Sequence, residues 1–226
     1  GKLAMKLVDR FASRSLRSSV CVLFATHVCH WKESVHQCLP VHIQGLESGL
    51  ETGNLEYACY AAAEYAQYLF LTGKPLTEVE PECRQKLQII KVLKQDFHIQ
   101  YLAPWHQGIL NLQSYKLENI EQLIGESYDE TMFLEEIVKE NKLTLGFSIF
   151  FVKMFLAYLF GHSEKAVNFG ELACRYTAGV FGTYFVPTTL FYHSLSLLVR
   201  NQANHSELDR DDLAQVDRTL EKLRNW

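Results

Sequence analysis

Hydrophobic residues recur along this chain with the spacing of a helix face. Two stripes repeat every four residues within residues 2–14: Leu3, Leu7 and Phe11, and Lys2, Lys6, Arg10 and Arg14. Side chains three or four residues apart lie on one face of an α-helix, so this spacing predicts an amphipathic helix. Strands would instead show alternating β-branched residues bounded by turns, and we find no such run. We therefore expect an all-α protein.

The same pattern predicts helices along nearly the whole chain. Pro40 and Pro104 are each expected in the first turn of a helix, where a missing N–H breaks no hydrogen bond. Asn54 is expected to cap the next helix, and the turn at 73–75 to end it. The predicted helices cover residues 2–14, 17–30, 32–39, about 40–52, 55–71, 82–98, 104–114, 130–141, 143–160, 164–180, 187–201 and 209–224.

Residues 45–73 and 159–176 share a pattern of small residues. Gly53 and Gly161 each end a helix, and Ala58 and Ala166 each follow five residues later. Glycine permits a left-handed turn, and the small residue then lets the second helix approach the first closely. The two copies lie 108 residues apart, which fits three units of about 36 residues, near the tetratricopeptide (TPR) period. This predicts an α-solenoid of antiparallel helix pairs, a TPR-like superhelix, forming a single domain over residues 1–226.

Four longer stretches resemble one class of signalling protein. They read "HVCHWKESVHQCLPVHIQGLESGLETGNLEYACYAA", "SYDETMFLEEIVKENKLTLGFSIFFVKMFLAYLFGHSEKAV", "PTTLFYHSLSLL" and "LEKLRNW". Their order and spacing resemble the helical region of large multidomain signalling proteins, found mainly in bacteria. In those proteins a serine/threonine kinase-like domain and a STAND-type AAA ATPase precede this region, and GAF or PAS sensors and a histidine kinase follow it. The resemblance, from about residue 15 onward, implies a TPR-like arm between ATPase and sensor.

The overall composition is typical of a soluble protein without a strong electrostatic field. The chain has 226 residues, 48% hydrophobic and 21% charged, with a net charge of −4. That balance gives no indication of nucleic-acid binding. Six cysteines without a CxxC pair favour reduced thiols and a cytoplasmic location. No signal peptide is recognised, and the start at Gly1 indicates a piece excised from a longer protein.

One apolar segment is long enough to raise the question of a membrane-spanning helix. Residues 145–161 approach the length of a bilayer span, but Lys153 lies at their centre, and a spanning helix needs about 20 apolar residues. A lysine at the bilayer centre is costly. We therefore expect a buried core helix and no membrane partner. Trp226 is expected to pack on a helix beyond this chain.

Sequence motifs of catalysis are missing. The phosphate-binding loop, GxGxxG, HRD, DFG, GxSxG and HExxH patterns do not occur. We therefore expect no enzyme activity and no cofactor, with any kinase or ATPase outside this chain. Tyr192, His193 and Ser194 diverge around a helix, and we expect Phe191, Leu195 and Leu198 to face the core there.

One cluster has residue types that bind soft metals. Soft thiolate and imidazole ligands suit zinc or copper. Their helical directions diverge, and buried cysteine behaves as a small hydrophobe, so we expect packing, with a metal site as the alternative. The cluster comprises His27, Cys29, His30, His36, Cys38 and His42.

An acidic segment precedes the most apolar helix. Residues 118–140 hold eight Asp or Glu against Lys139 alone. We expect a solvated surface, or a face for a basic partner such as the stripe of Lys2, Lys6, Arg10 and Arg14.

These observations favour an interaction and signal-relay function. The chain would bind a protein partner or flanking domains through the first helix of each pair. The alternative is a small-molecule sensor whose aromatic residues, at 147–160 and 181–192, line an apolar pocket. By resemblance, the partner-binding positions are Ile43, Glu47, Leu50, Phe151, Phe155 and Tyr158.

Overall fold

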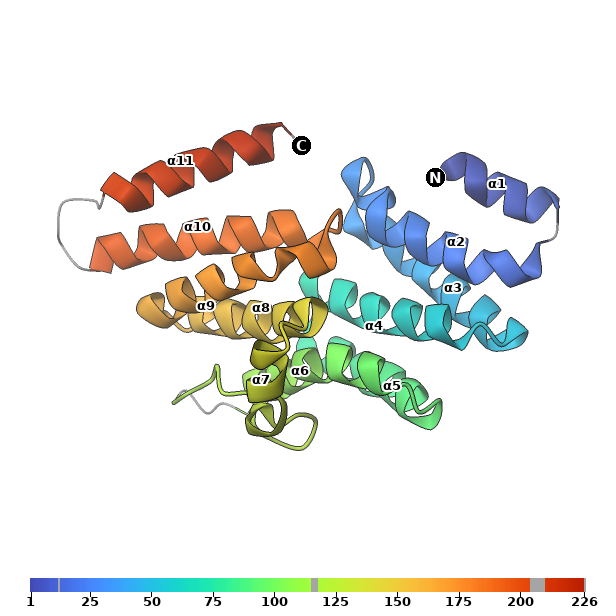
Figure 1. Cartoon of the computed structure of the whole chain (residues 1–226), viewed down its shortest axis with the longest axis horizontal. Coiled ribbons are helices and arrows are strands. Elements are labelled where there is room, and N and C mark those ends of the chain that lie inside the picture. The colour runs from blue at the N-terminus through green and yellow to red at the C-terminus, as the bar shows by residue number, and fades with distance from the viewer. Residues whose placement is uncertain (12, 115–117, 204–209, 226) are drawn as a thin grey trace. The chain divides into compact units, whose positions relative to one another are not determined.

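The fold is all-helical, as the hydrophobic period predicts. The computed structural model describes residues 1–11, 13–114, 118–203 and 210–225. Helices make up 81% of the described residues, which contain no β-strand and a single isolated bridge between Ile124 and Asp129. The elements in Figure 1 are α1 (Lys2–Arg10), α2 (Arg14–His27), η1 (Cys29–Trp31), η2 (Val35–Gln37), α3 (Cys38–Thr52), α4 (Leu55–Leu71), α5 (Leu76–Val92), α6 (Asp96–Gln113), α7 (Glu130–Lys139), α8 (Leu143–Leu159), α9 (Ser163–Arg175), η3 (Thr177–Val180), α10 (Phe185–Ala203) and α11 (Arg210–Arg224).

Internal contacts divide the chain into two compact units. Unit 1 comprises Gly1–His106 with Gly182–Tyr184, and unit 2 comprises Gln107–Phe181 with Phe185–Trp226. The organisation of residues 1–226 as a single domain stays a prediction. Trp226, for which we predict packing on a further helix, lies outside the described residues.

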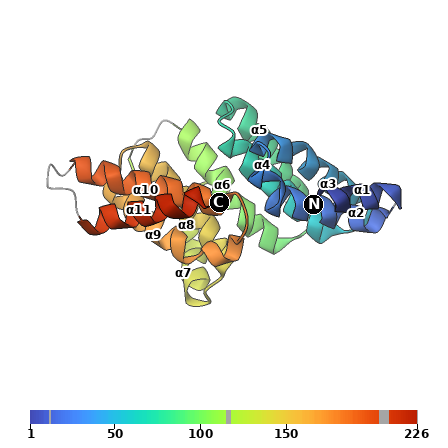
Figure 2. The ribbon, with the colours of Figure 1, turned by 90° about the horizontal axis from the view of Figure 1, so that it is seen from above.

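Unit 1 is built from helices that pack on their neighbours in sequence. Helix α1 packs on α2, α2 on α3, α3 on α4 and α4 on α5, and Figure 2 shows this series from above. Small residues let α4 lie close to α3. The buried alanines of α4 are Ala58, Ala61, Ala62, Ala63 and Ala66.

The turn between α3 and α4 has the predicted left-handed glycine, but Asn54 caps α4 through its backbone alone. Gly53 has φ +75°, a left-handed conformation that glycine adopts without a Cβ clash. Asn54 occupies the N-cap position, where its carbonyl accepts a hydrogen bond from the Ala58 N–H at 3.0 Å. Its side chain makes no capping hydrogen bond. The predicted helix 55–71 is confirmed.

Residues 32–39 do not form the predicted helix. The chain instead makes two short 3₁₀ turns, η1 and η2, before α3 begins at Cys38. Ser34 is extended, with ψ +144°, and its hydroxyl accepts a hydrogen bond from the His36 N–H. Such side-chain bonds compete with helical backbone bonds and favour turns. Pro40 nevertheless lies in the first turn of α3, as predicted.

The predictions for helices 82–98 and 104–114 are wrong. The helical structure is interrupted at residues 93–95 instead, where Lys94 adopts φ +55°. Helix α6 begins at Asp96, so Pro104 lies inside it rather than in its first turn. An interior proline costs about 3 kcal/mol, but Leu102, Trp105 and Ile109 are buried on the same helix, and this packing offsets that cost.

Smaller differences occur at other helix ends. Helix α1 ends at Arg10, four residues before the predicted end, and α2 extends from Arg14 to His27 rather than over 17–30. The predicted helix 164–180 ends at Arg175 and is followed by the 3₁₀ turn η3. Helix ends depend on capping contacts that a hydrophobic period does not specify.

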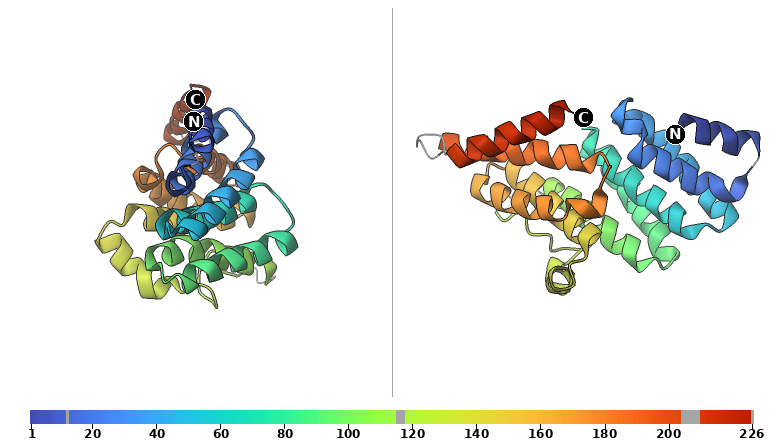
Figure 3. Two further views of the ribbon diagram at one scale, coloured as in Figure 1. Left: turned by 90° about the vertical axis from the view of Figure 1, so that its right-hand side faces the viewer. Right: turned by 45° about the horizontal axis from the view of Figure 1, so that its top comes forward.

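Unit 2 is organised around α8. Helix α7 packs on α8, α8 on α9, α9 on α10 and α10 on α11, as Figure 3 shows. Residues 145–154 of α8 are all buried, which confirms the predicted core helix. Every helix within the described ranges falls short of the length and apolarity that a membrane crossing requires.

Candidate functional site

The predicted partner-binding positions on α3 lie at the surface of unit 1. Glu47 and Leu50 are exposed, and Ile43 is half-buried. Their role in partner binding stays a prediction. Glu47 lines an open groove together with Arg14, Arg17, Gln44, Ser48 and Glu51.

The predicted positions on α8 differ in exposure. Phe151 is fully buried, and its ring stacks on those of Phe147 and Phe155 at centroid distances of 5.5 and 6.2 Å. Phe151 therefore belongs to the core of unit 2. Phe155 and Tyr158 are half-buried and meet the ring of Tyr192 edge-on, at 4.9 and 5.4 Å.

Several aromatic residues of the sensor alternative pack against one another. Phe185 contacts the rings of Phe147 and Phe151 at centroid distances of 6.0 and 6.4 Å. Together with Phe155 and Tyr192 they form a continuous aromatic cluster, and such ring pairs stabilise a core beyond the area they bury. These rings support the packing of α8 and α10 in unit 2.

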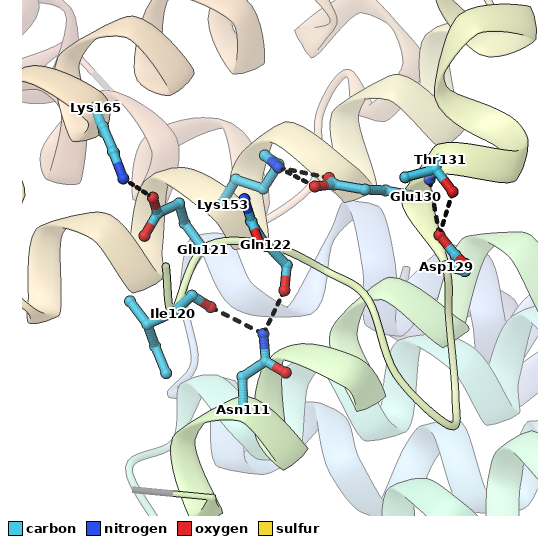
Figure 4. Close-up of polar contacts among 9 residues, drawn as sticks. All are labelled: Asn111, Ile120, Glu121, Gln122, Asp129, Glu130, Thr131, Lys153 and Lys165. Atoms are coloured by element: carbon cyan, nitrogen blue, oxygen red, sulfur yellow. Dashed lines mark hydrogen bonds and ion pairs between the residues drawn. The ribbon is translucent and has the colours of Figure 1, made fainter. Parts of the chain in front are cut away.

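The first half of the acidic segment is a loop fixed to α6. The Asn111 amide donates to the carbonyls of Ile120 and Gln122 at 2.9 and 2.8 Å, as Figure 4 shows. The Gln107 side-chain oxygen accepts hydrogen bonds from the backbone N–H groups of Ser127 and Tyr128 at 3.0 and 3.3 Å. Two amide side chains of one helix therefore determine the course of this loop.

Most acids of residues 118–140 are exposed, as expected. Two of them are instead buried and ion-paired, which corrects the expectation of a solvated surface at these two positions. The Lys153 Nζ contacts both carboxylate oxygens of Glu130, at 2.6 and 2.5 Å, and each residue is less than 10% exposed. Glu121 is 3% exposed and pairs with Lys165 and with His162 Nδ1, the latter at 3.1 Å. Figure 4 shows Glu130 directed toward Lys153 and Glu121 toward Lys165.

Electrostatics favour the ionised form of Glu121. Burial raises the pKa of this carboxyl, but hydrogen bonds from Lys165 and His162 outweigh burial, and its pKa lies below the usual range. The segment is thereby attached to α9 by the ion pairs of Glu121, and to α6 by the side-chain amide hydrogen bonds described above. The sequence signal for the Lys153–Glu130 pair was the isolated Lys153 in an apolar helix, since a buried lysine requires a carboxylate partner.

Unit 1 has a buried polar centre that the sequence analysis missed. The Thr26 hydroxyl donates to a carboxylate oxygen of Glu64, and His42 Nδ1 lies 3.8 Å from the same oxygen. Burial raises the pKa of Glu64 to about 8 and lowers the pKa of His42 to about 3. Both groups are therefore mainly uncharged at neutral pH. Tyr68 covers the centre, with its ring edge-on to His42 at 5.2 Å.

The cluster of histidines and cysteines between residues 27 and 42 is divided between core and surface. Cys29, Cys38 and His42 are buried, whereas His27 and His36 are exposed. Burial raises the pKa of Cys38 to about 12, so its thiol stays protonated at neutral pH. Across the described ranges, His, Cys, Asp and Glu side chains form no group of three or more that could hold a metal ion.

The region around His193 also differs from prediction. Phe191, expected in the core, is 49% exposed, while His193 and Leu197 are buried. Helix α10 is thus rotated about its axis relative to the predicted orientation. Gly170 on α9 explains this rotation, because a Cβ at Gly170 would collide with the His193 ring. Cys174 Sγ lies 3.7 Å from His193 Nδ1, but burial raises the pKa of Cys174 to about 11 and lowers that of His193. The pair is therefore a neutral packing contact rather than an activated thiolate.

Comparison with known proteins gives one distant relation. No protein-family model matches the chain, and no solved structure matches it significantly. Over 119 residues, 52% of this chain, it is 24% identical to hybrid signal transduction histidine kinase G of Dictyostelium discoideum. That match spans 3% of the kinase. The similarity indicates a relation to signalling histidine kinases, in agreement with the resemblance at that level.

Proposed function

We propose that this chain is a non-catalytic helical module that relays signals within a multidomain signalling kinase or ATPase. It would do so by binding a partner protein or the flanking domains of the same polypeptide. The observation that carries the proposal is the similarity to a hybrid signal transduction histidine kinase. The match covers a small part of that kinase, as a module inserted among other domains would.

Helix packing within each unit supports a relay. Consecutive helices contact each other from α1 to α5 and from α7 to α11, so a displacement of one helix is passed to the next. We propose that the helix pairs form a TPR-like α-solenoid. The repeated pattern of small residues supports this proposal: Gly53 and Gly161 have φ +75° and +73°, and Ala58 and Ala166 are fully buried.

The partner would meet the first helix of each pair. Glu47 and Leu50 are the exposed candidates on α3, and Phe155 and Tyr158 are the half-buried candidates on α8. The groove beside Glu47 contains cations and carboxylates, and such mixed charge suits a polar peptide or helix surface.

The state of the thiols supports a non-catalytic role. Burial raises the pKa of Cys59 and Cys174 to about 11 and that of Cys38 to about 12. A nucleophilic cysteine requires a lowered pKa, since the thiolate is the reactive form. These side chains therefore act as small apolar groups that fill the helix contacts.

The purified chain tests the proposal against its alternatives. We expect no ATP hydrolysis above the level of a heat-denatured sample, and no stabilisation by a library of metabolites in a thermal-shift screen. A recombinant flanking domain should raise the melting temperature, because a ligand of the folded state stabilises it. ATP turnover would contradict the proposal. A metabolite that raises the melting temperature by several degrees would favour the sensor instead.

A further inference from the structure

Helix α1 carries two parallel ridges of different chemistry. A basic residue directly precedes an apolar one at three places, each four residues apart: Lys2–Leu3, Lys6–Leu7 and Arg10–Phe11. Rows of side chains four residues apart form the ridges through which helices interlock. The helix therefore has an apolar ridge with a basic ridge along one side.

The apolar ridge faces away from α2. Helix α1 buries Val8 and half-buries Met5. A Cβ at Gly1 would lie 2.6 Å from the Phe24 ring, so Gly1 is also on the packed side. The ridge residues, by contrast, keep much of their surface in solvent. Leu3 is 68% exposed, Leu7 42% and Phe11 68%.

Two cations of the basic ridge are available to a partner. Lys2 is paired with Glu33 at 2.6 Å. Among the described residues, Lys6 and Arg10 have no carboxylate partner, and the Arg10 guanidinium lies over the Phe11 ring at 5.8 Å. Residues 1–17 contain five basic residues and the single acid Asp9, whereas the whole chain has a net charge of −4. The face is thus locally positive.

We propose that this face, which we call the α1 ridge (Leu3, Lys6, Leu7, Arg10 and Phe11), docks an acidic amphipathic helix of a partner protein. The inference rests on the proposed interaction function and specifies one of its surfaces. An apolar row on the partner would pack along Leu3, Leu7 and Phe11. Carboxylates beside that row would then meet Lys6 and Arg10, which determines the direction of the partner helix.

Charge and packing favour this partner over two others. Two copies of the α1 ridge would bring cations against cations, which opposes self-association through this face. A helix lying on a membrane buries its whole apolar face in the lipid interface, whereas Met5 and Val8 of α1 pack on the protein and leave a narrow apolar row in solvent. Successive residues are about 100° apart on a helix, so Lys6 and Arg10 both lie on the same side of that row.

Peptide binding to the full chain tests the inference. The probe is a fluorescein-labelled helix of about 20 residues with the repeat Glu-Leu-Ala-Ala, long enough to be helical in water. Its matched control has Lys in place of Glu. Fluorescence anisotropy should show binding of the acidic peptide at least about tenfold tighter than of the basic one. Raising the ionic strength should weaken that binding, because exposed charges are screened.

Variants assign the binding to the α1 ridge. Leu3→Gln/Leu7→Gln should weaken acidic-peptide binding at least about tenfold through lost apolar contact, and Lys6→Gln/Arg10→Gln should remove most of its salt dependence. The matched control is Lys91→Gln/Val92→Gln at the end of α5, where an exposed Lys and an exposed Val are adjacent but the pair does not repeat. This control should bind as the unaltered chain does. All these positions are exposed, and circular dichroism should show unchanged helix content.

Four results would overturn the inference: equal binding of the two peptides, full binding by Leu3→Gln/Leu7→Gln, self-association that depends on the α1 ridge, or preferential binding of this ridge to vesicles of anionic lipid. The same ridge variants in the whole signalling protein separate this inference from the proposed function. If they leave its signal response intact while deletion of the chain abolishes it, the relay function stands and the α1 ridge is not its docking surface.

Discussion

Gly49 on α3 and Ala58 on α4 lie in direct contact across the turn at Gly53. A Cβ at Gly49 would be 2.8 Å from the Ala58 Cβ, closer than two carbon atoms pack. The absence of a side chain at Gly49 and the small one at Ala58 therefore set the spacing of the two helices. In unit 2, Ala157 and Ala166 occupy the same places relative to Gly161, and both are fully buried.

Ala58→Leu and Ala166→Leu should each destabilise the protein. Three extra carbon atoms would be inserted into close helix contacts, and overpacking of this kind costs about 1–3 kcal/mol. Urea unfolding followed by circular dichroism measures the change. Gln44→Leu, on the exposed side of α3, is the control and should change the free energy of unfolding little. If both alanine variants match the unaltered chain, the repeat assignment is wrong.

Lys153→Met should be among the most destabilising single substitutions in unit 2. It leaves the buried Glu130 carboxylate without its cation, and loss of one partner of a buried pair costs about 3–5 kcal/mol. Lys165→Met is the comparison, because Lys165 is 48% exposed and His162 still contacts Glu121. We expect a cost below about 1 kcal/mol there. Urea midpoints that rank the two variants in the opposite order would contradict the assignment.

A second substitution should restore part of the stability lost in Lys153→Met. Adding Glu130→Gln removes the buried charge itself, so the double variant should be more stable than Lys153→Met alone. A double-mutant cycle gives the coupling energy between the two side chains. A coupling near zero would show that Lys153 and Glu130 do not interact in solution.

Glu64→Gln should change how stability depends on pH. The pKa of Glu64 is about 8 in the folded protein, above the ordinary 4.5, so between these values the folded state binds more protons than the unfolded state. Stability from this group is therefore full below pH 4.5 and is lost as pH rises toward 8, by at most about 1.4 kcal/mol per pH unit. The difference in free energy of unfolding, variant minus unaltered chain, should become more positive from pH 5 to pH 8. A constant difference over that range would show that Glu64 titrates normally.

The spacing of apolar residues was sufficient to predict the class of fold and the core helix α8. It did not specify where helices end or how they are rotated. Pro104 lies inside α6 because tertiary burial of that helix outweighs a local preference, and the prediction considered the local preference alone. Phe191 is exposed to solvent because Gly170, on another helix, makes room for His193 in the core. Such contacts between distant segments cannot be obtained from periodicity.

The polar features were the least predictable part of the candidate site. The acidic composition of residues 118–140 concealed the burial of Glu121 and Glu130, since their partners Lys165 and Lys153 lie on helices further along the chain. Glu64 sits in an alanine-rich helix, and nothing in its sequence neighbourhood reveals Thr26 or His42 beside it. The exposed apolar row on α1 was visible as a stripe, but its outward orientation required the packing of α1 on α2.

The signal response of the proposed multidomain signalling kinase tests the central claim most directly. For that proposed kinase the measurement is signal-dependent histidine phosphorylation, with and without the segment that corresponds to residues 1–226. We expect the deletion to abolish the response to signal while nucleotide binding by the other domains is retained. An unchanged response after deletion would contradict the proposal that this chain relays the signal.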